Sequence, residues 1–321
     1  MPAVKPLLRD RSTKIPTDMP NRFLPLVDGR AFQDGKNPYI QHAVQYQPGA
    51  NLRAEEFYIH HLLDTTQCSS GAIRRFNPAG VRRYLVEKFV EDRWVSEGNS
   101  RLSEMLEGNI RSNLRRFQAL AEIRILDFGP SGGAITTLFA LRALDRFGLM
   151  DKAKITLLDV VPDVVNMTIA GDFEFPQAMA EAYGLGFAGT DGSCFKRILS
   201  QAVPIISDFH DFDPGEKFHI ILNAYTIHHL NIFDKADCAG FMESALAPNG
   251  AIAIVDFYVR SFDEYRSWLI RHLEANPSSP APVESPYFTR KQIGGLFSGQ
   301  VRVVDNDDAL EKSWALLMER S

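Results

Sequence analysis

From residue 123 onward, short apolar runs alternate with helical stretches, and this alternation most limits how the chain can fold. Each run is rich in Ile, Val, Leu or Phe, as expected for strands buried on both faces of a parallel sheet. The runs are Ile123–Phe128, Ile155–Val161, Val203–Ser207, His219–Asn223 and Ala251–Phe257. The helices between them are predicted at Ala134–Phe147, Phe173–Tyr183 and Phe233–Leu246. The order predicts an α/β fold with a doubly wound, mostly parallel sheet.

Two further strands are expected near the C-terminal end, over Gln300–Val304 and Ser313–Met318. They are close enough in sequence to pair antiparallel at one edge, which brings the predicted sheet to seven strands. The sheet domain is expected to span residues 121–321.

The part of the chain before the sheet has a different character. Residues 1–50 are rich in Pro and turn-forming residues and are expected to form an extended arm. Residues 51–120 show apolar residues at helical spacing, with the last helix running from about Ser100 to Phe117. We expect this second segment to be an N-terminal helical cap that helps to bind substrate.

Charge and cysteine content exclude several classes of protein. The net charge is −5, and residues 121–321 carry 17 Lys and Arg against 27 Asp and Glu. Such an acidic sheet domain argues against nucleic acid as a partner. The three cysteines form no CxxC pair, so we expect neither a disulfide framework nor a zinc site. We expect a cytoplasmic location instead. No apolar stretch approaches the ~18–20 residues of a membrane helix.

The end of the first strand carries the most informative motif. An acidic residue, Asp127, is followed by a turn that contains Gly129, Ser131 and Gly133 and then by a helix. Glycines let the backbone approach a ligand closely, and ligands of open α/β sheets lie beyond the carboxyl ends of the strands. Taken alone, the motif is weak evidence, because a tight strand-to-helix turn without a ligand is the alternative explanation.

Acidic residues also end the next two strands. Asp159, with Val160 beside it, ends the second strand, where a carboxylate can accept hydrogen bonds from the two hydroxyls of a ribose. NAD-binding domains use the same device, so this feature indicates a nucleoside without saying which. Asp208 and Phe209 end the third strand, where an acid can bind the amino group of adenine and an aromatic ring can pack on the base.

The fourth strand ends in Asn223, followed by Tyr225 and the pair His228 and His229, and a Leu-Ala-Pro-Asn-Gly turn precedes the fifth strand. Together these motifs resemble, in order and spacing over residues 121–260, the class I S-adenosylmethionine-dependent methyltransferases, in particular those acting on small molecules. The resemblance implies a Rossmann-like fold with a reversed strand near one edge and S-adenosylmethionine as cofactor. It says nothing of residues 1–120 beyond a helical cap that often lies over the cofactor.

The resemblance also implies roles for individual residues. Those that would contact the methionine part of the cofactor are Asp127, Gly129, Ser131 and Gly133, with Asn223 beside the sulfonium. Those that would contact the nucleoside are Asp159, Val160, Asp208 and Phe209. Two departures are Ser131 in place of the usual middle glycine and a long segment between Asp159 and Asp208. An insertion within 163–201 either covers the site or lengthens a surface loop.

The implied activity is methyl transfer to a small biosynthetic acceptor, without a metal, a nucleic acid or a membrane. His228, His229 and Tyr225 are the candidate catalytic residues, with a histidine as base; the alternative is that one His packs and the other contacts the cofactor. An enzyme of the same fold could instead transfer the aminocarboxypropyl group or cyclise the cofactor, releasing methylthioadenosine. A non-catalytic partner subunit is a further alternative, and a homodimer is compatible with the sequence. The Gly-x-x-Gly-Gly order argues against an NAD-dependent oxidoreductase.

Overall fold

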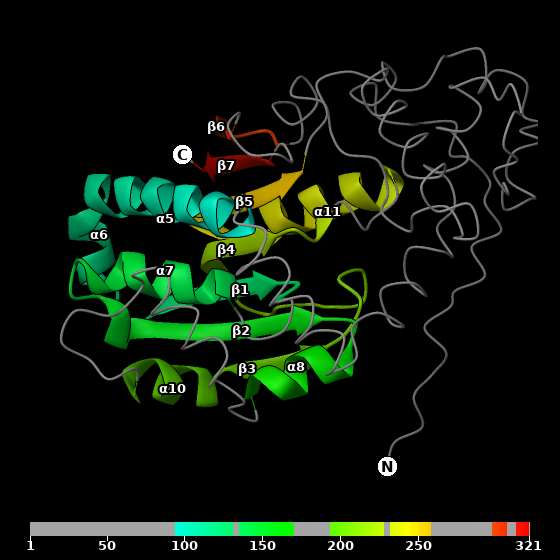
Figure 1. The fold of residues 1–321 in the computed structure, drawn as a ribbon, viewed down its shortest axis with the longest axis horizontal. Coiled ribbons are helices and arrows are strands. Elements are labelled where there is room, and N and C mark those ends of the chain that lie inside the picture. Colours follow the sequence, from blue (N-terminus) through cyan, green and yellow to red (C-terminus); the bar gives the residue numbers. More distant parts are fainter. Residues whose placement is uncertain are drawn as a thin grey trace, which may run out of the picture.

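The computed structural model describes residues 94–130, 135–169, 193–227, 232–257, 297–306 and 313–320. They form a seven-stranded sheet with helices packed on both faces (Figure 1). The strands are β1 (Ile123–Phe128), β2 (Ala153–Asp159), β3 (Val203–Ile206), β4 (Phe218–Ala224), β5 (Leu246–Phe257), β6 (Gln300–Asn306) and β7 (Ser313–Glu319). The helices are α5 (Trp94–Ser112), α6 (Leu114–Ala119), α7 (Ile135–Asp145), α8 (Pro162–Ile169), α10 (Ser193–Ser200) and α11 (Ile232–Ala245), with a short 3-10 turn, η4, over Met150–Lys152.

The strand order across the sheet is β3-β2-β1-β4-β5-β7-β6. Strands β1 to β5 are parallel, whereas β7 runs antiparallel to β5 and β6 runs antiparallel to β7. This arrangement confirms the predicted α/β fold class, a doubly wound and mostly parallel sheet of seven strands. The reversed strand β7 lies between β5 and β6, so the C-terminal pair forms one side of the sheet as expected.

Each predicted strand overlaps an observed one, but β2 lies two residues earlier than predicted and β5 begins at Leu246, inside the predicted turn, with a register shift against β4 before Ala251. The environment of β3 also differs from the prediction. This strand was expected to be buried on both faces, whereas Val203 is 52% and Ile206 is 47% exposed. The reason is the strand order, which places β3 at the edge of the sheet, where it pairs only with β2. An edge position also suits Pro204, which has no backbone N–H to donate to a second neighbour.

Helix α5 packs on the sheet rather than apart from it. Its apolar residues Leu102, Leu106 and Ile110 are buried in the same core as the strands, and the helix contacts α7, β5 and β7. A polar side chain of α5 also contacts α7: the Ser103 hydroxyl donates to the backbone oxygen of Phe139 at 3.3 Å. The last part of the expected unit 51–120 therefore belongs to the helical layer on the sheet.

Several expectations lie outside the described residues. They include the arm 1–50, the helices before residue 94 and the predicted helix Phe173–Tyr183. Within the described part of the segment between β2 and β3, the structure contains α8 and α10. The apolar core on the α5 side also includes α7 and α10, whereas α11 packs on the opposite face through Phe241 and Phe128.

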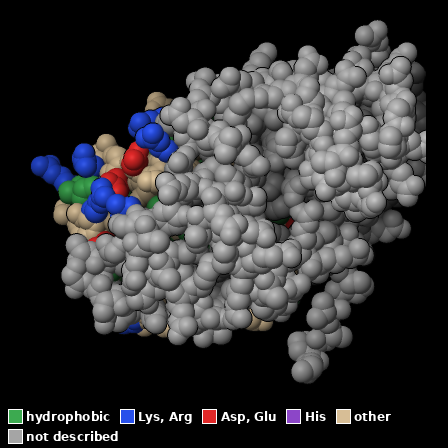
Figure 2. Space-filling view, viewed as in Figure 1, with side chains coloured by type: hydrophobic (Ala, Val, Ile, Leu, Met, Phe, Trp, Pro, Cys, Tyr) green, Lys and Arg blue, Asp and Glu red, His purple; other side chains and the backbone are tan. Residues whose placement is uncertain are grey.

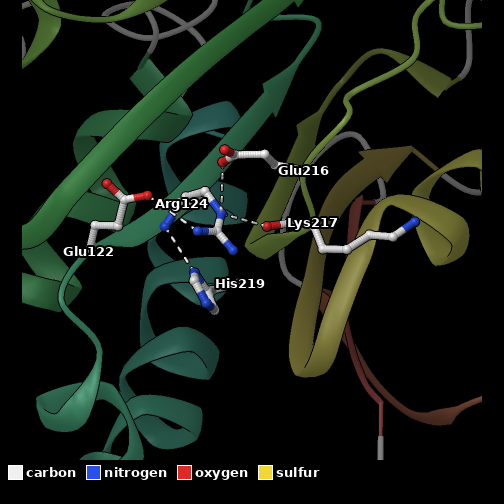
Figure 3. A network of polar contacts seen from close by, with 5 residues as sticks. All are labelled: Glu122, Arg124, Glu216, Lys217 and His219. Atoms are coloured by element: carbon white, nitrogen blue, oxygen red, sulfur yellow. Dashed lines mark hydrogen bonds and ion pairs between the residues drawn. The ribbon is translucent and has the colours of Figure 1, made fainter.

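A polar network joins the amino ends of β1 and β4 (Figure 3). The Arg124 guanidinium donates to the backbone oxygen of Lys217 at 2.7 Å and contacts Glu122 at 3.2 Å and Glu216 at 3.5 Å. The backbone N–H of Arg124 donates to Nδ1 of His219 at 3.0 Å. Burial and the positive charge of Arg124 lower the pKa of His219, in keeping with a neutral ring that accepts at Nδ1. The network holds the two strands together at the end of the sheet where each begins.

Basic and acidic side chains alternate on the surface over the α5 end of the molecule (Figure 2). Arg101 contacts Glu104 at 3.1 Å, and Arg146, just after α7, contacts Glu107 of α5 at 2.5 Å. Both glutamates belong to α5, so the exposed side of this helix carries ion pairs, as expected for a solvated face. Among the described helices, none is both long enough and apolar enough to cross a membrane.

Candidate functional site

The point where the sheet changes winding direction lies between β1 and β4. The chain runs from β1 outward to β2 and β3 and then returns to the other side of β1 as β4. In open α/β sheets, a ligand binds beyond the carboxyl ends of the strands at this switch point. Asp127 of β1 and Asn223 of β4 stand there, because Asp127 pairs with Leu222 and Asn223 follows directly.

Asp127 is completely buried at the end of β1. Its Oδ2 accepts a hydrogen bond from the Thr137 hydroxyl of α7 at 2.5 Å, while its Oδ1 has no hydrogen-bond partner among the described residues. Burial, with a smaller contribution from the nearby negative charge of Asp159, raises the pKa of Asp127 to about 7 against the lowering effect of Thr137. A buried carboxylate oxygen without a donor is costly. Asp127 thus presents an acceptor that a cationic or donor group of a ligand would satisfy.

Asn223 is also completely buried, on the strand next to Asp127. Its Nδ2 donates to the backbone oxygen of Phe128 at 2.9 Å, which leaves the side-chain oxygen Oδ1 without a partner within the described part of the chain. Two buried acceptor oxygens therefore occur at the ends of adjacent strands, and the ends of these strands are joined by the Asn223–Phe128 bond. A ligand group with several N–H donors fits this pair of acceptors.

Asp159 ends β2 and is held by the backbone that follows it. The N–H of Val161 donates to its Oδ1 at 2.9 Å, and the N–H of Val160 also bonds the carboxylate. Burial raises the pKa of Asp159 to about 6, although part of its side chain reaches the surface. The carboxylate is fixed in direction and partly accessible, as a group that receives hydroxyl donors must be. The side chain of Val160 is half-buried against the core.

Gly129 links the glycine-rich turn to the end of β4. Its φ of +74° lies in the left-handed region, and a Cβ there would overlap the Thr226 hydroxyl and lie 2.5 Å from the Thr226 methyl group. The hydroxyl of Thr226 is 3.2 Å from the backbone oxygen of Gly129 and 3.0 Å from that of Ala224. Only a glycine fits at 129, so this expected site residue is required by the close approach of two loops.

Asp208 and Phe209, expected near adenine, follow β3. Oδ1 of Asp208 accepts from the backbone N–H of His210 at 2.9 Å and contacts the Nδ1 of the same residue at 2.6 Å. The Phe209 ring is buried, with its centroid 5.6 Å from that of Phe128 and 5.9 Å from that of Phe241. Packing of Phe209 on Phe128 places the loop after β3 beside the end of β1.

Tyr225, a candidate catalytic residue, is buried beneath α5. It has a φ of +50°, its N–H donates to the backbone oxygen of Val255 at 2.8 Å, and its ring belongs to the apolar core. A Cβ at Gly98 of α5 would overlap the Tyr225 hydroxyl, so the side chain lies against that helix. The other candidates, Ser131, Gly133, His228 and His229, lie outside the described residues.

Sequence reasoning missed three residues of this region. Thr137 donates to Asp127, and the Thr226 hydroxyl contacts the backbone of Gly129. A single threonine shortly after a glycine-rich turn or a strand end is too common in sequences to indicate such a contact. Asp256 is 1% exposed near the end of β5. It could have been found, because an acid also closes the apolar runs of β1 and β2. In the described ranges, no group of three or more His, Cys, Asp or Glu side chains is arranged to hold a metal ion.

The sequence matches no protein-family model and no curated protein. Among solved structures, the chain is similar to magnesium protoporphyrin IX methyltransferase from Synechocystis PCC 6803 with bound S-adenosylhomocysteine. The identity is 12%, the TM-score is 0.49, and the match covers 79% of this chain and 100% of that chain. For the N-methyltransferase NodS from Bradyrhizobium japonicum WM9 the identity is 14% and the TM-score is 0.37, and the match covers 67% of this chain and 87% of that chain. For a putative O-methyltransferase from Nostoc punctiforme PCC 73102 the identity is 12% and the TM-score is 0.44, and the match covers 81% of this chain and 68% of that chain. The fold follows from the chain's own strand order, β3-β2-β1-β4-β5-β7-β6.

Proposed function

We propose that the chain binds S-adenosylmethionine at the carboxyl ends of β1, β2 and β4 and transfers its methyl group to a small-molecule acceptor. The observation that carries this proposal is a pair of buried oxygens, Oδ1 of Asp127 and Oδ1 of Asn223, that have no donor among the described residues and lie at the switch point of the sheet. The cofactor carries an ammonium and a sulfonium, and positive charge suits a buried site that contains a carboxylate.

The residues present fit the two ends of this cofactor. Asp127 and Asn223 would accept hydrogen bonds from the ammonium of its methionine part, which would remove the cost of two unpaired buried oxygens. Asp159, held by the N–H groups of residues 160 and 161, would accept from the ribose hydroxyls. Asp208 and Phe209 remain the residues proposed to contact adenine.

When bound, S-adenosylmethionine supplies a methyl group on a good leaving group, so the protein's main task is alignment. The chain's own residues would orient the cofactor from three neighbouring strand ends and keep bulk water from the buried side of the site. If the acceptor is a hydroxyl or an ammonium, a base must take its proton. We propose His228 or His229 for that role, because both follow the end of β4 in the sequence.

Replacing Asp159 with Ala is expected to weaken binding of S-adenosylhomocysteine by about tenfold or more, because charge-assisted hydrogen bonds contribute ~1.5–3 kcal/mol each. Isothermal titration calorimetry measures the change. Asp151→Ala is the matched control: this residue lies just before β2, at the opposite end of the same strand, and pairs on the surface with Arg197 at 2.6 Å. Equal weakening in both variants, or none in Asp159→Ala, would contradict the proposed ribose contact.

Affinity for S-adenosylhomocysteine is expected to fall by about tenfold or more when the pH is lowered from 7.5 to 5.5. The pKa of Asp127 is about 7 and that of Asp159 about 6, so both carboxyls take up protons over this range and no longer attract an ammonium or hydroxyl donors as strongly. Titrations at both pH values measure the change, with circular dichroism to establish that the chain stays folded. A constant affinity would mean that neither carboxylate faces the ligand.

The group transferred is tested by the products formed from S-adenosylmethionine in the presence of a pool of small metabolites. Methyl transfer releases S-adenosylhomocysteine and adds a methyl mass to one acceptor. Release of methylthioadenosine would instead identify aminocarboxypropyl transfer or cyclisation, and mass spectrometry separates the two products. Binding without either product over a broad pool would favour a partner subunit.

A further inference from the structure

We propose that Tyr225 is a positioning residue of the candidate site. Its side chain packs against Gly98 of α5, a contact that we call the seat of Tyr225, and this contact fixes the loop after β4 against the glycine-rich turn. The inference rests on the proposed function, because the site that the loop would shape is the proposed cofactor site. It goes beyond that function by assigning a role to α5, a helix whose described side chains take no part in the hydrogen bonds given above for Asp127, Asp159 and Asn223.

The backbone of Tyr225 holds an uncommon conformation. Its φ of +50° is one of two positive values among the described non-glycine residues, and a bulky side chain in this region is strained. Such strain persists only where the surroundings enforce it. Here the N–H bond to the Val255 oxygen at 2.8 Å and the burial of the ring, which is 5% exposed, enforce it.

Gly98 provides the space for the end of the Tyr225 ring. A Cβ at this position would overlap the Tyr225 hydroxyl, lie 2.8 Å from a Val255 methyl group and lie 3.3 Å from Cζ of Tyr225. Glycine inside a helix lowers its stability relative to alanine, so a reason is needed for it there. Gly108, on the same helix, has nothing within 4 Å of an added Cβ. The close approach at Gly98 is therefore a feature of one turn of α5.

The residues on both sides of Tyr225 hold the first strand's loop. Asn223 donates to the backbone oxygen of Phe128 at 2.9 Å, and the Thr226 hydroxyl lies 3.2 Å from the backbone oxygen of Gly129. A displacement of Tyr225 from its seat would move these two contacts, which join the end of β4 to the turn after β1. The position of α5 is in this way coupled to the geometry of the site without touching the ligand.

The test compares Gly98→Ala with Gly108→Ala, and both with the wild type, by calorimetric titration with S-adenosylhomocysteine. Gly98→Ala is expected to weaken binding about tenfold, because the added methyl group pushes the tyrosine out of its seat. Gly108→Ala is expected to bind as the wild type does. The double variant Gly98→Ala/Tyr225→Phe lacks the overlapping hydroxyl and is expected to bind at least threefold more tightly than Gly98→Ala. The single variant Tyr225→Phe completes the double-mutant cycle.

A folded Gly98→Ala with wild-type affinity, or a double variant without recovery, would overturn the proposal. If Gly98→Ala does not fold, recovery of folding in the double variant supports the seat, and failure to recover contradicts it. Failure of the proposed function gives a different result, since the wild type itself would not bind the ligand. In that event, amide hydrogen exchange decides: Gly98→Ala must speed exchange at Tyr225 and Gly129, and the double variant must slow it again.

Discussion

Replacing Asp127 with Asn is expected to make the folded chain more stable at pH 8 while it weakens binding of S-adenosylhomocysteine about 10- to 100-fold. Both effects have one cause, the burial of a carboxylate with one oxygen that has no partner within the part of the chain that the structure describes. Asn has nearly the same shape and can still accept the Thr137 hydroxyl bond, but it carries no charge. The loss of a charge-assisted hydrogen bond accounts for the weaker binding.

The gain in stability depends on pH, and its sign follows from the pKa. Burial raises the pKa of Asp127 from an ordinary 3.8 to about 7, so the folded state binds a proton more tightly than the unfolded chain does. The wild type therefore loses stability as the pH rises from 4 to 7 and is constant above that, with a total cost of up to about 4 kcal/mol. Asn removes this cost, so the difference is largest at pH 8 and closes toward pH 4.

Urea unfolding at several pH values measures the difference in the free energy of unfolding. Asp145→Asn is the control: Asp145 is a partly exposed acid in the last turn of α7 and is expected to change neither stability nor binding by a measurable amount. If Asp127→Asn is less stable than the wild type at pH 8, or binds the ligand equally well, Asp127 does not have the role assigned to it.

Replacing Gly129 with Ala is expected to destabilise the fold by about 3 kcal/mol or more. A left-handed φ costs an alanine about 1–2 kcal/mol, and the added methyl group would also overlap the Thr226 side chain, which adds strain of about 1–3 kcal/mol. Gly148→Ala is a matched control, because Gly148 has a similar φ of +65° but nothing within 4 Å of an added Cβ. Gly148→Ala is expected to lower the free energy of unfolding only by the cost of the left-handed φ, about 1–2 kcal/mol.

The difference between these two variants isolates the contact between the turn and the end of β4. Adding Thr226→Ala to Gly129→Ala removes the two closest atoms, the hydroxyl and the methyl group, and should restore part of the stability. Thermal and urea unfolding measure all four chains. Equal costs at positions 129 and 148 would show that the two loops do not meet as described.

The sheet could be read from the sequence because its strands are set by local patterns. The apolar run Ile123–Phe128 is the observed β1, and β2 ends at Asp159, the acid predicted to close the second strand, although the apolar run was extended to Val161. In a parallel sheet, such ends meet at one edge, so the candidate site could be predicted from strand ends alone.

The rest depends on contacts between residues far apart in the chain. The edge position of β3 follows from strand order, which the composition of Val203–Ile206 does not reveal. Helix α5 was expected in a separate cap, because its place on the sheet depends on partners such as Phe139, 36 residues away from Ser103. The seat of Tyr225 on Gly98 is likewise a tertiary contact. A tyrosine beside two histidines was interpreted as catalytic, whereas the fold buries its ring beneath α5.

The central claim is that the ends of β1, β2 and β4 form a site for S-adenosylmethionine. Calorimetric titration of the wild-type chain with S-adenosylhomocysteine at pH 7.5, beside a titration with NADH, tests it most directly. The account predicts micromolar binding of S-adenosylhomocysteine at one site per chain and at least tenfold weaker binding of NADH. The absence of binding by S-adenosylhomocysteine, or equal affinity for NADH, would contradict it.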